Sequence, residues 1–279
     1  MVDNYFPCRS QKPVFSRANG KELWVLILEK VWAKIHGSYQ TIIGGQSYEV
    51  FRDLLGAPSF YHKTNEDHIK EIIENAYNNN FIISATSYPT KKEEDKLDRV
   101  GILNLQSYSL LRIATVPDQN GTMCDIVQLR NPWGNFEWSG DWSDESVCWT
   151  DEAKRMVNLQ INESDGLFWM SFQDFVSNFV SIHLCKFVDT YNFSSFKKVQ
   201  RESDWHLFGI TLNKDGNQTF SISLTDKCCF EQPDKIKYSS CRFIIVRLAN
   251  DHDLSDGVKF MGSLYEHWER DYYIELKDV

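Results

Sequence analysis

Apolar residues recur at helical spacing in two segments near the N-terminus. Residues 21–38 predict an amphipathic helix whose apolar face is formed by Leu23, Ile27, Leu28, Val31 and Ile35. Residues 65–79 predict a second helix, with Asn65 as its N-cap and an apolar side formed by Ile69, Ile72, Ile73 and Ala76. Between them, residues 50–56 run into LLGAP and predict a short strand or turn.

Strand-like patterns dominate the next part of the chain. The apolar run FIISATS predicts a buried strand at residues 81–87. Two further strands are predicted at residues 101–116 and 123–129, joined as a hairpin by a turn at residues 118–121. Residues 167–187 predict a strand, a helix and a last strand in turn. This mixture predicts an α+β fold, in which an antiparallel sheet or barrel carries helices on one side.

The pattern changes after a boundary at residues 188–195. Short alternating strands are then predicted at residues 205–211, 218–225, 241–248 and 271–276. Strands of this length and spacing are typical of a β-sandwich. The chain ends soon after the last of them, so we expect an incomplete antiparallel β-sandwich. The predicted domains are therefore residues 1–188 and residues 196–279.

Composition narrows the class of protein. The net charge of −9 and the pI near 5.3 argue against nucleic acid as the main partner. No apolar run is long enough to span a bilayer, and we expect neither a transmembrane segment nor a signal peptide. The seven cysteines are scattered and odd in number, without a CxxC pair, which favours neither a disulfide framework nor a zinc site. A reducing, cytoplasmic location is the simplest interpretation.

The most distinctive stretch is residues 126–144, IVQLRNPWGNFEWSGDWSD. An apolar strand breaks at Asn131, because a residue that precedes proline is disfavoured in helical conformations. Three tryptophans and three acids follow, the acids being Glu137, Asp141 and Asp144. Buried aromatic rings can hold such a loop rigid, so that its amide and carboxylates are positioned for chemistry. The alternative is a tryptophan-rich β corner whose acids are merely solvated.

The sequence strings RNPWG, EW and GDWSD closely resemble the Asn-bearing segment of the calpain family, cysteine endopeptidases of the papain superfamily. Residues 21–45 are similar to the helix that opens the second half of the calpain protease core, and the C-terminal strands are similar to the β-sandwich that follows it. The resemblance implies a papain-like second subdomain, acting on proteins or peptides. It also implies that Asn131 occupies the position that orients the catalytic histidine.

The histidine itself is replaced. The family segment G-L-x-x-G-H-A-Y-S matches GILNLQSYS at residues 101–109, and the histidine position holds Gln106. A glutamine amide exchanges hydrogen bonds but accepts no proton near neutral pH, so it cannot act as the general base.

The resemblance also implies that the nucleophilic Cys belongs to a separate upstream subdomain, whereas this chain begins near the second one. We therefore expect the nucleophile to be absent here. Cys8 lacks the helix N-terminus and the upstream Gln that the family motif requires. The sequence thus predicts a non-catalytic homologue, a pseudoprotease that acts through binding. The alternative is a fragment of an active calcium-dependent endopeptidase that hydrolyses peptide bonds with a Cys-bearing segment from upstream.

The resemblance finally implies a weak calcium site. It places carboxylate ligands at Glu137, Asp144 and Asp165 and a backbone carbonyl ligand at Glu163. Carboxylates, carbonyls and waters can together reach the oxygen count that Ca²⁺ needs. Leu167 stands where the family usually has a further Glu, which would weaken binding. The alternative is that these acids only form hydrogen bonds within their loops.

Overall fold

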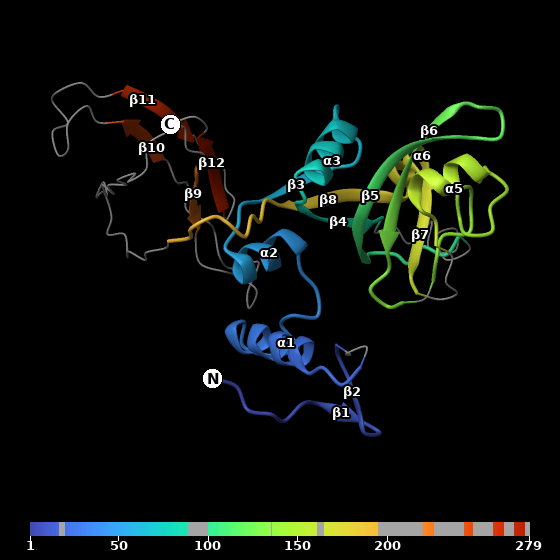
Figure 1. The fold of residues 1–279 in the computed structure, drawn as a ribbon. Helices are drawn as coiled ribbons and strands as arrows, with labels where there is room; N and C mark the ends of the chain where they lie inside the picture. The colour runs from blue at the N-terminus through green and yellow to red at the C-terminus, as the bar shows by residue number, and fades with distance from the viewer. Residues whose placement is uncertain are drawn as a thin grey trace. The chain divides into compact units, whose positions relative to one another are not determined.

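The computed structural model describes residues 1–16, 20–88, 100–134, 136–160, 165–194 and four strands within residues 220–276 (Figure 1). The chain forms two compact units. One combines Met1–Gly45 with Phe196–Val279, and the other is Gln46–Ser195. The charged run at residues 91–99 and the strand predicted at residues 205–211 lie outside the described residues.

The second unit is built on a six-stranded sheet in which every pair of neighbours is antiparallel, in the order β3-β8-β4-β5-β6-β7 (Figure 1). Its strands are β3 (Ser59–Lys63), β4 (Ile82–Ser87), β5 (Ser107–Pro117), β6 (Met123–Arg130), β7 (Leu167–Ser171) and β8 (Phe179–Cys185). The predicted antiparallel sheet is confirmed, as an open sheet rather than a closed barrel. Together with its helices it gives the α+β fold expected from the sequence.

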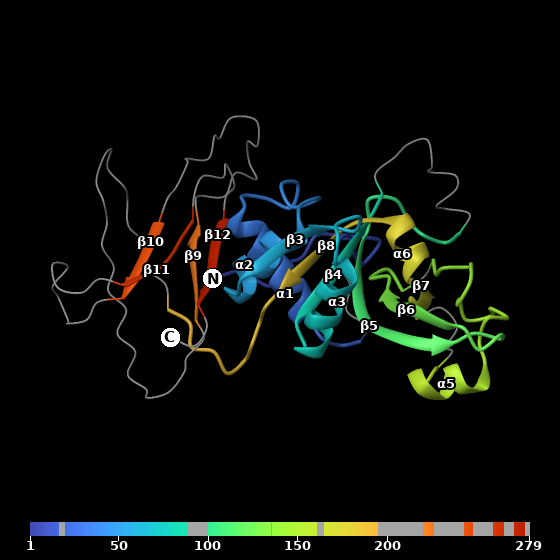
Figure 2. The ribbon, with the colours of Figure 1, turned by 90° about the horizontal axis from the view of Figure 1, so that it is seen from above.

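Both faces of this sheet are buried. On β6, Val127 and Leu129 belong to one apolar cluster, whereas Ile126 belongs to the other. Neighbouring side chains of a strand point to opposite faces, so each face covers its own core. The helices α3 (Ile69–Asn78) and α6 (Phe172–Asn178) pack in the first cluster, and α5 (Asp151–Val157) packs in the second (Figure 2). This double burial explains why the adjacent positions Ile126 and Val127 of β6 are both apolar.

Two of the expected helix features were wrong. Residues 50–56 lie largely in the helix α2 (Ser47–Leu55) rather than in a strand or turn. Its end is set by Gly56, whose φ of 65° provides the left-handed residue that often follows a helix. The helix α3 is capped at His68, not at Asn65, because the preceding turn is held by Glu66, whose carboxylate accepts from the Lys63 N–H.

The helix predicted at residues 21–38 is α1 (Trp24–Ile35), but the expected buried face was wrong. The buried residues are Leu26, Trp32 and Ala33, whereas the predicted positions Leu23, Ile27, Leu28 and Ile35 are exposed. The helix is apolar on several sides, so helical periodicity alone does not identify the stripe that is covered.

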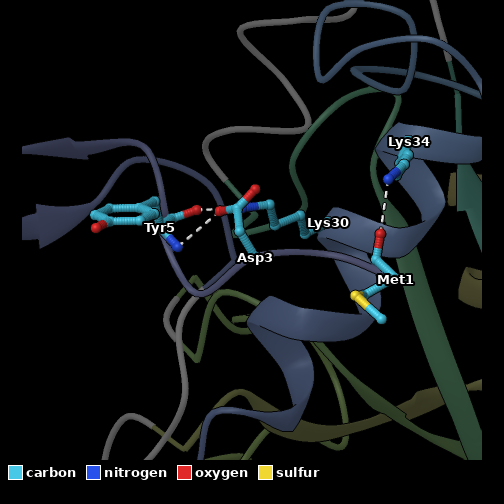
Figure 3. A network of polar contacts seen from close by, with 5 residues as sticks. All are labelled: Met1, Asp3, Tyr5, Lys30 and Lys34. Atoms are coloured by element: carbon cyan, nitrogen blue, oxygen red, sulfur yellow. Dashed lines mark hydrogen bonds and ion pairs between the residues drawn. The ribbon is translucent and has the colours of Figure 1, made fainter.

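The first residues of the chain run beside α1. A short hairpin pairs β1 (Cys8–Arg9) with β2 (Lys12–Pro13). Figure 3 shows Lys30 of α1 meeting the carboxylate of Asp3 and the backbone carbonyl of Tyr5. One turn further on, Lys34 Nζ donates to the carbonyl of Met1 at 2.6 Å. Two lysines of one helical face thus hold the N-terminal segment along the helix.

The C-terminal strands pair as two antiparallel ladders. β9 (Phe220–Thr225) pairs with β12 (Asp271–Leu276), and β10 (Phe243–Arg247) pairs with β11 (Lys259–Leu264). Three of these four strands were expected, and β11 was missed. The β-sandwich and the domain boundary at residues 188–195 stay predictions. Across the described parts of the chain, no helix combines the length and the apolar character needed to cross a membrane.

His183 of β8 is fully buried and gives the fold a pH dependence. Its ring stacks on Tyr48 at 5.6 Å and meets Tyr61 edge-on at 5.4 Å, and its Nε2 lies 3.3 Å from Thr86 Oγ1. Burial lowers the pKa of His183 from 6.5 to about 4, because the charged imidazolium is poorly solvated there.

We therefore expect this histidine to destabilise the protein in mild acid. Below its ordinary pKa the unfolded chain binds a proton that the folded protein excludes, so stability falls as the pH drops from 6.5 towards 4. Between pH 7.5 and pH 4.5 this contribution amounts to about 2–3 kcal/mol. Urea unfolding of the unaltered chain and of His183→Gln at both pH values measures it. The variant retains hydrogen-bonding groups without this titration, and equal losses in both proteins would contradict the assignment.

Candidate functional site

The β5–β6 hairpin brings Gln106 and Asn131 to the same end of the sheet. Gln106 immediately precedes β5 and Asn131 immediately follows β6, and the pairing of Ser109 with Arg130 sets the two residues on one rim. This shared rim is what the hairpin predicted from residues 101–116 and 123–129 implies, because Gln106 and Asn131 lie at its open end. The strand begins later than expected, at Ser107, so that residues 101–106 form a loop in front of it.

The side chain of Gln106 is engaged at both ends of its amide. Oε1 accepts a hydrogen bond from the indole N–H of Trp133 at 2.9 Å, and Nε2 donates to the carbonyl of Ser107 at 3.1 Å. Its backbone N–H donates to Ser87 Oγ at 3.0 Å, which ties the loop to β4. The residue is therefore held in place as a neutral hydrogen-bonding group.

Asn131 is fully buried and organises the turn that follows β6. Its Oδ1 accepts from the backbone N–H of Trp133 at 3.1 Å, and its Nδ2 donates to the carbonyl of Phe136 at 3.1 Å. An Asn side chain that bonds two residues ahead is a recognised way to fix a turn. Trp133 thus links the two predicted site residues, since its backbone N–H binds Asn131 and its indole N–H binds Gln106.

The role of Trp133 was missed by the sequence prediction, which counted it only as one of three bracing tryptophans. The residue is 68% exposed, so it lies at the surface instead of packing in the core. The only sequence signal was its place directly after the Asn-Pro break.

The other two tryptophans do brace the loop. Trp138 packs in the first apolar cluster, and its indole N–H donates to the carbonyl of Asp141 at 2.8 Å. Trp142 packs in the second cluster, edge-on to Trp149 at 5.0 Å. Gly140 lies between them with no room for a side chain, because an added Cβ would stand 2.2 Å from the Trp138 ring. The loop is therefore anchored in both cores, as the interpretation of a rigid loop requires.

The predicted calcium ligands come from two loops that meet. Glu137 Oε1 accepts from the backbone N–H of Gly166 at 2.8 Å, and Asp165 Oδ1 accepts from the N–H of Leu167 at 2.8 Å. Burial, followed by the nearby charges of Glu137 and Asp165, raises the pKa of Asp144 to about 6. The charges of Glu137 and Asp165 thus act on the carboxylate of Asp144.

The described residues do not by themselves form a complete set of ligands for the predicted calcium site. Within the residues that the structure describes, no three acidic, His or Cys side chains are grouped so as to hold a metal ion. Glu163 lies outside the described residues. The hydrogen bonds of Glu137 and Asp165 also engage one oxygen of each carboxylate, which favours a role within the loops.

The loop that carries Gln106 touches the acidic loop through backbone atoms. Gly101 has a φ of 84°, and a Cβ added there would lie 1.8 Å from the carbonyl oxygen of Glu137. The N–H of Ser139 also donates to the carbonyl of Val100 at 3.1 Å. Only a glycine permits this approach, so the two halves of the candidate site are in direct contact.

The substitution Gly101→Ala should therefore destabilise the protein by far more than the left-handed backbone conformation of this residue alone would cause. Gly121→Ala is the matched control, because Gly121 has a similar φ of 80° but nothing within 4 Å of its added Cβ. We expect the control to cost about 1 kcal/mol and Gly101→Ala to cost more than about 3 kcal/mol. Urea unfolding at neutral pH compares them. Equal losses of unfolding free energy in the two variants would show that the structure around Glu137 accommodates the added Cβ at little cost.

Comparison with known proteins places this site in a family. Residues 1–186 match the family model described as "Calpain family cysteine protease". The calpain-type cysteine protease ADL1 of rice is 33% identical over 198 residues, which cover 67% of this chain and 9% of that protein. Rat calpain-8 is 30% identical over 190 residues, which cover 66% of this chain and 27% of that protein.

The mouse calpain-2 catalytic subunit is 26% identical over 280 residues, which cover 97% of this chain and 38% of that protein. This chain therefore spans well under two thirds of each of these relatives. The family match covers the sheet, the Gln106 loop and the tryptophan-rich loop alike. This chain belongs to the calpain family of cysteine proteases.

Proposed function

We propose that this chain is a non-catalytic calpain homologue that binds protein or peptide partners and does not cleave them. The observation that carries the proposal is Gln106, which occupies the histidine position of the family motif and whose amide is held by Trp133 and Ser107. Thiol proteolysis needs a group that takes the nucleophile's proton and returns it to the leaving amine. A neutral amide does neither near pH 7.

The neighbouring Asn131 does not repair this defect. Both ends of its amide are used within the turn, by the Trp133 N–H and the Phe136 carbonyl. In a triad the third residue orients an imidazole, and without the imidazole its contribution to the rate is lost. Removing one triad member typically lowers the rate by several orders of magnitude. Binding of a peptide requires no proton transfer and is unaffected by this loss.

The second candidate function is calcium-dependent hydrolysis of peptide bonds, with a Cys-bearing segment supplied from upstream. The specific observation in its favour is that Gln106 and Asn131 still share one rim and are joined through Trp133. Replacing Gln106 by histidine would therefore place an acid–base group on the same rim as Asn131.

We also propose a weak calcium site formed by Glu137, Asp144 and Asp165, with a carbonyl from Glu163. Its support is the meeting of two loops at the Glu137–Gly166 hydrogen bond and the raised pKa of Asp144, which is caused first by burial and then by repulsion from the charges of Glu137 and Asp165. A bound Ca²⁺ would supply positive charge that offsets this repulsion. Weak binding is expected, because two of the carboxylates already accept backbone N–H bonds and Leu167 contributes no carboxylate.

A cytoplasmic location accompanies this proposal. Its support within the described residues is that Cys8, Cys124, Cys148 and Cys185 are all free thiols. Free thiols of this number are typical of reducing compartments.

The unaltered protein is expected to show no peptide hydrolysis above the uncatalysed background, because its Gln106 cannot act as a general base. The assay uses the longest natural product that contains this chain, with a casein substrate and millimolar calcium. Gln106→Asn is the control that stays neutral, and Gln106→His restores a titratable group. Hydrolysis by the unaltered protein that is abolished by a thiol-alkylating reagent would overturn the proposal. A gain of about a thousandfold in Gln106→His alone would identify a decayed protease whose Cys lies upstream.

Calcium binding is expected to be in the sub-millimolar to millimolar range and to depend on Asp144. Isothermal titration calorimetry with CaCl₂ compares the unaltered chain with Asp144→Asn, which keeps the size of the side chain but removes its charge. Asp151→Asn is the control, because Asp151 is exposed in the first turn of α5 and is not among the proposed ligands. Heat that is lost only in Asp144→Asn supports the site, whereas no heat in any of the three proteins would remove it.

A further inference from the structure

Two cysteines pack against the second apolar cluster at the end of the β5–β6 hairpin that is remote from Gln106. Cys124 lies on β6 directly opposite Val116 of β5. Residues that are directly opposite in an antiparallel pair project from the same face of the sheet. Val116 belongs to the second apolar cluster, and Cys124 packs against that same cluster. The Cys124 side chain is therefore directed to the face that α5 covers.

Cys148 reaches this place from the loop that precedes α5. The side-chain amide of Gln119, in the hairpin turn, donates to the carbonyl of Val147 at 3.0 Å and to that of Trp149 at 3.1 Å. Thr150 Oγ1 donates to the carbonyl of Pro117 at 3.2 Å. The backbone on both sides of Cys148 is thus fastened to the turn. Cys148 also packs against the second apolar cluster, as Cys124 does.

We propose that Cys124 and Cys148 form a redox pair that closes a disulfide when the protein meets a peroxide. Both thiols are half-buried, so a small oxidant can reach them while the surrounding cluster shields them from larger ones. Short cysteine motifs such as CxxC do not predict this pair, because its members lie 24 positions apart (124 to 148). The hairpin and the loop before α5 bring them to the same cluster.

The chemistry needs no group beyond the peroxide. The Cys148 thiolate attacks the O–O bond of hydrogen peroxide and becomes a sulfenic acid, with release of one water after protonation. The Cys124 sulfur then displaces the hydroxyl group, the S–S bond forms and a second water leaves. Overall, two thiols lose two electrons and two protons, and one peroxide is reduced to two waters.

The order of the two steps follows from the surroundings of Cys124. Burial, together with the charges of Asp118 and Cys148, raises the pKa of the Cys124 thiol, so it is mostly protonated near neutral pH. Because the thiolate is the nucleophile, Cys124 is the poorer first attacker, and we assign it the second, resolving step.

The disulfide would fasten the loop before α5 to the hairpin by a covalent bond. That loop contains Trp149, which packs between Trp142 and Trp169, and it follows directly on Asp144. Oxidation would therefore restrict the acidic loop from its C-terminal side. This inference concerns residues outside the proposed calcium and peptide sites, and it stands whether or not those proposals hold.

The test is to map disulfides in the intact chain after exposure to peroxide. The reduced protein is treated with one to five equivalents of hydrogen peroxide, remaining thiols are alkylated with N-ethylmaleimide, and the product is digested with trypsin without reduction. Trypsin places the two cysteines in separate peptides, residues 113–130 and 131–154. We expect mass spectrometry to detect the two peptides joined by a disulfide, at the sum of their masses less two hydrogens. Dithiothreitol should separate them.

Serine variants and a denatured sample complete the experiment. Cys124→Ser and Cys148→Ser are each expected to abolish the linked pair, whereas Cys8→Ser, at an exposed strand outside the cluster, keeps it. In 8 M urea the preference for this pair should disappear, because seven cysteines then compete. The proposal is overturned if N-ethylmaleimide still alkylates both Cys124 and Cys148 of the folded, unaltered protein after the peroxide treatment. It is equally overturned if either thiol joins a different cysteine as readily.

Discussion

The register of the β5–β6 hairpin determines where Gln106, Asn131 and Cys124 lie. Burial on both faces of β6 fixes this register, because a slip of one residue would exchange Ile126 with Val127 and carry each into the wrong core. Once the register is set, Gln106 and Asn131 share one rim and Cys124 stands opposite Val116 at the other end. The chemistry of the chain therefore rests on apolar side chains that take no part in it.

The second organising element is the tryptophan-rich loop, which is stabilised from two cores at once. Trp138 enters one cluster and Trp142 the other, so the neighbouring acids Glu137, Asp141 and Asp144 are carried on a segment that is anchored in both. One acid of this loop is unfavourably placed for ionisation. Burial, followed by the charges of Glu137 and Asp165, raises the pKa of Asp144 to about 6, so its charged form is disfavoured in this setting.

The sequence predicted the parts of this fold that depend on local pattern. The hairpin, the strand at residues 81–87 and the strand–helix–strand unit at residues 167–187 follow from period and turn chemistry, and so does the shared rim. The stripe of α1 that is buried could not be chosen, because several stripes are apolar and tertiary packing decides among them. The start of α3 failed for a similar reason, since the Glu66 carboxylate engages the Lys63 N–H in a turn that competes with a helix beginning at Asn65. The bond from Trp133 to Gln106 joins two loops 27 positions apart, and no local rule anticipates it.

The approach of Gly101 to Glu137 has a thermodynamic consequence. Because the backbones of the two loops touch, a ligand that displaces the acidic loop must also displace the loop that carries Gln106. Such coupling is reciprocal: any factor by which a cation changes peptide affinity at the rim is the factor by which the peptide changes cation affinity. Under the proposals made above for peptide and calcium binding, the contact at Gly101 would therefore link the two sites, even in a protein that carries out no catalysis.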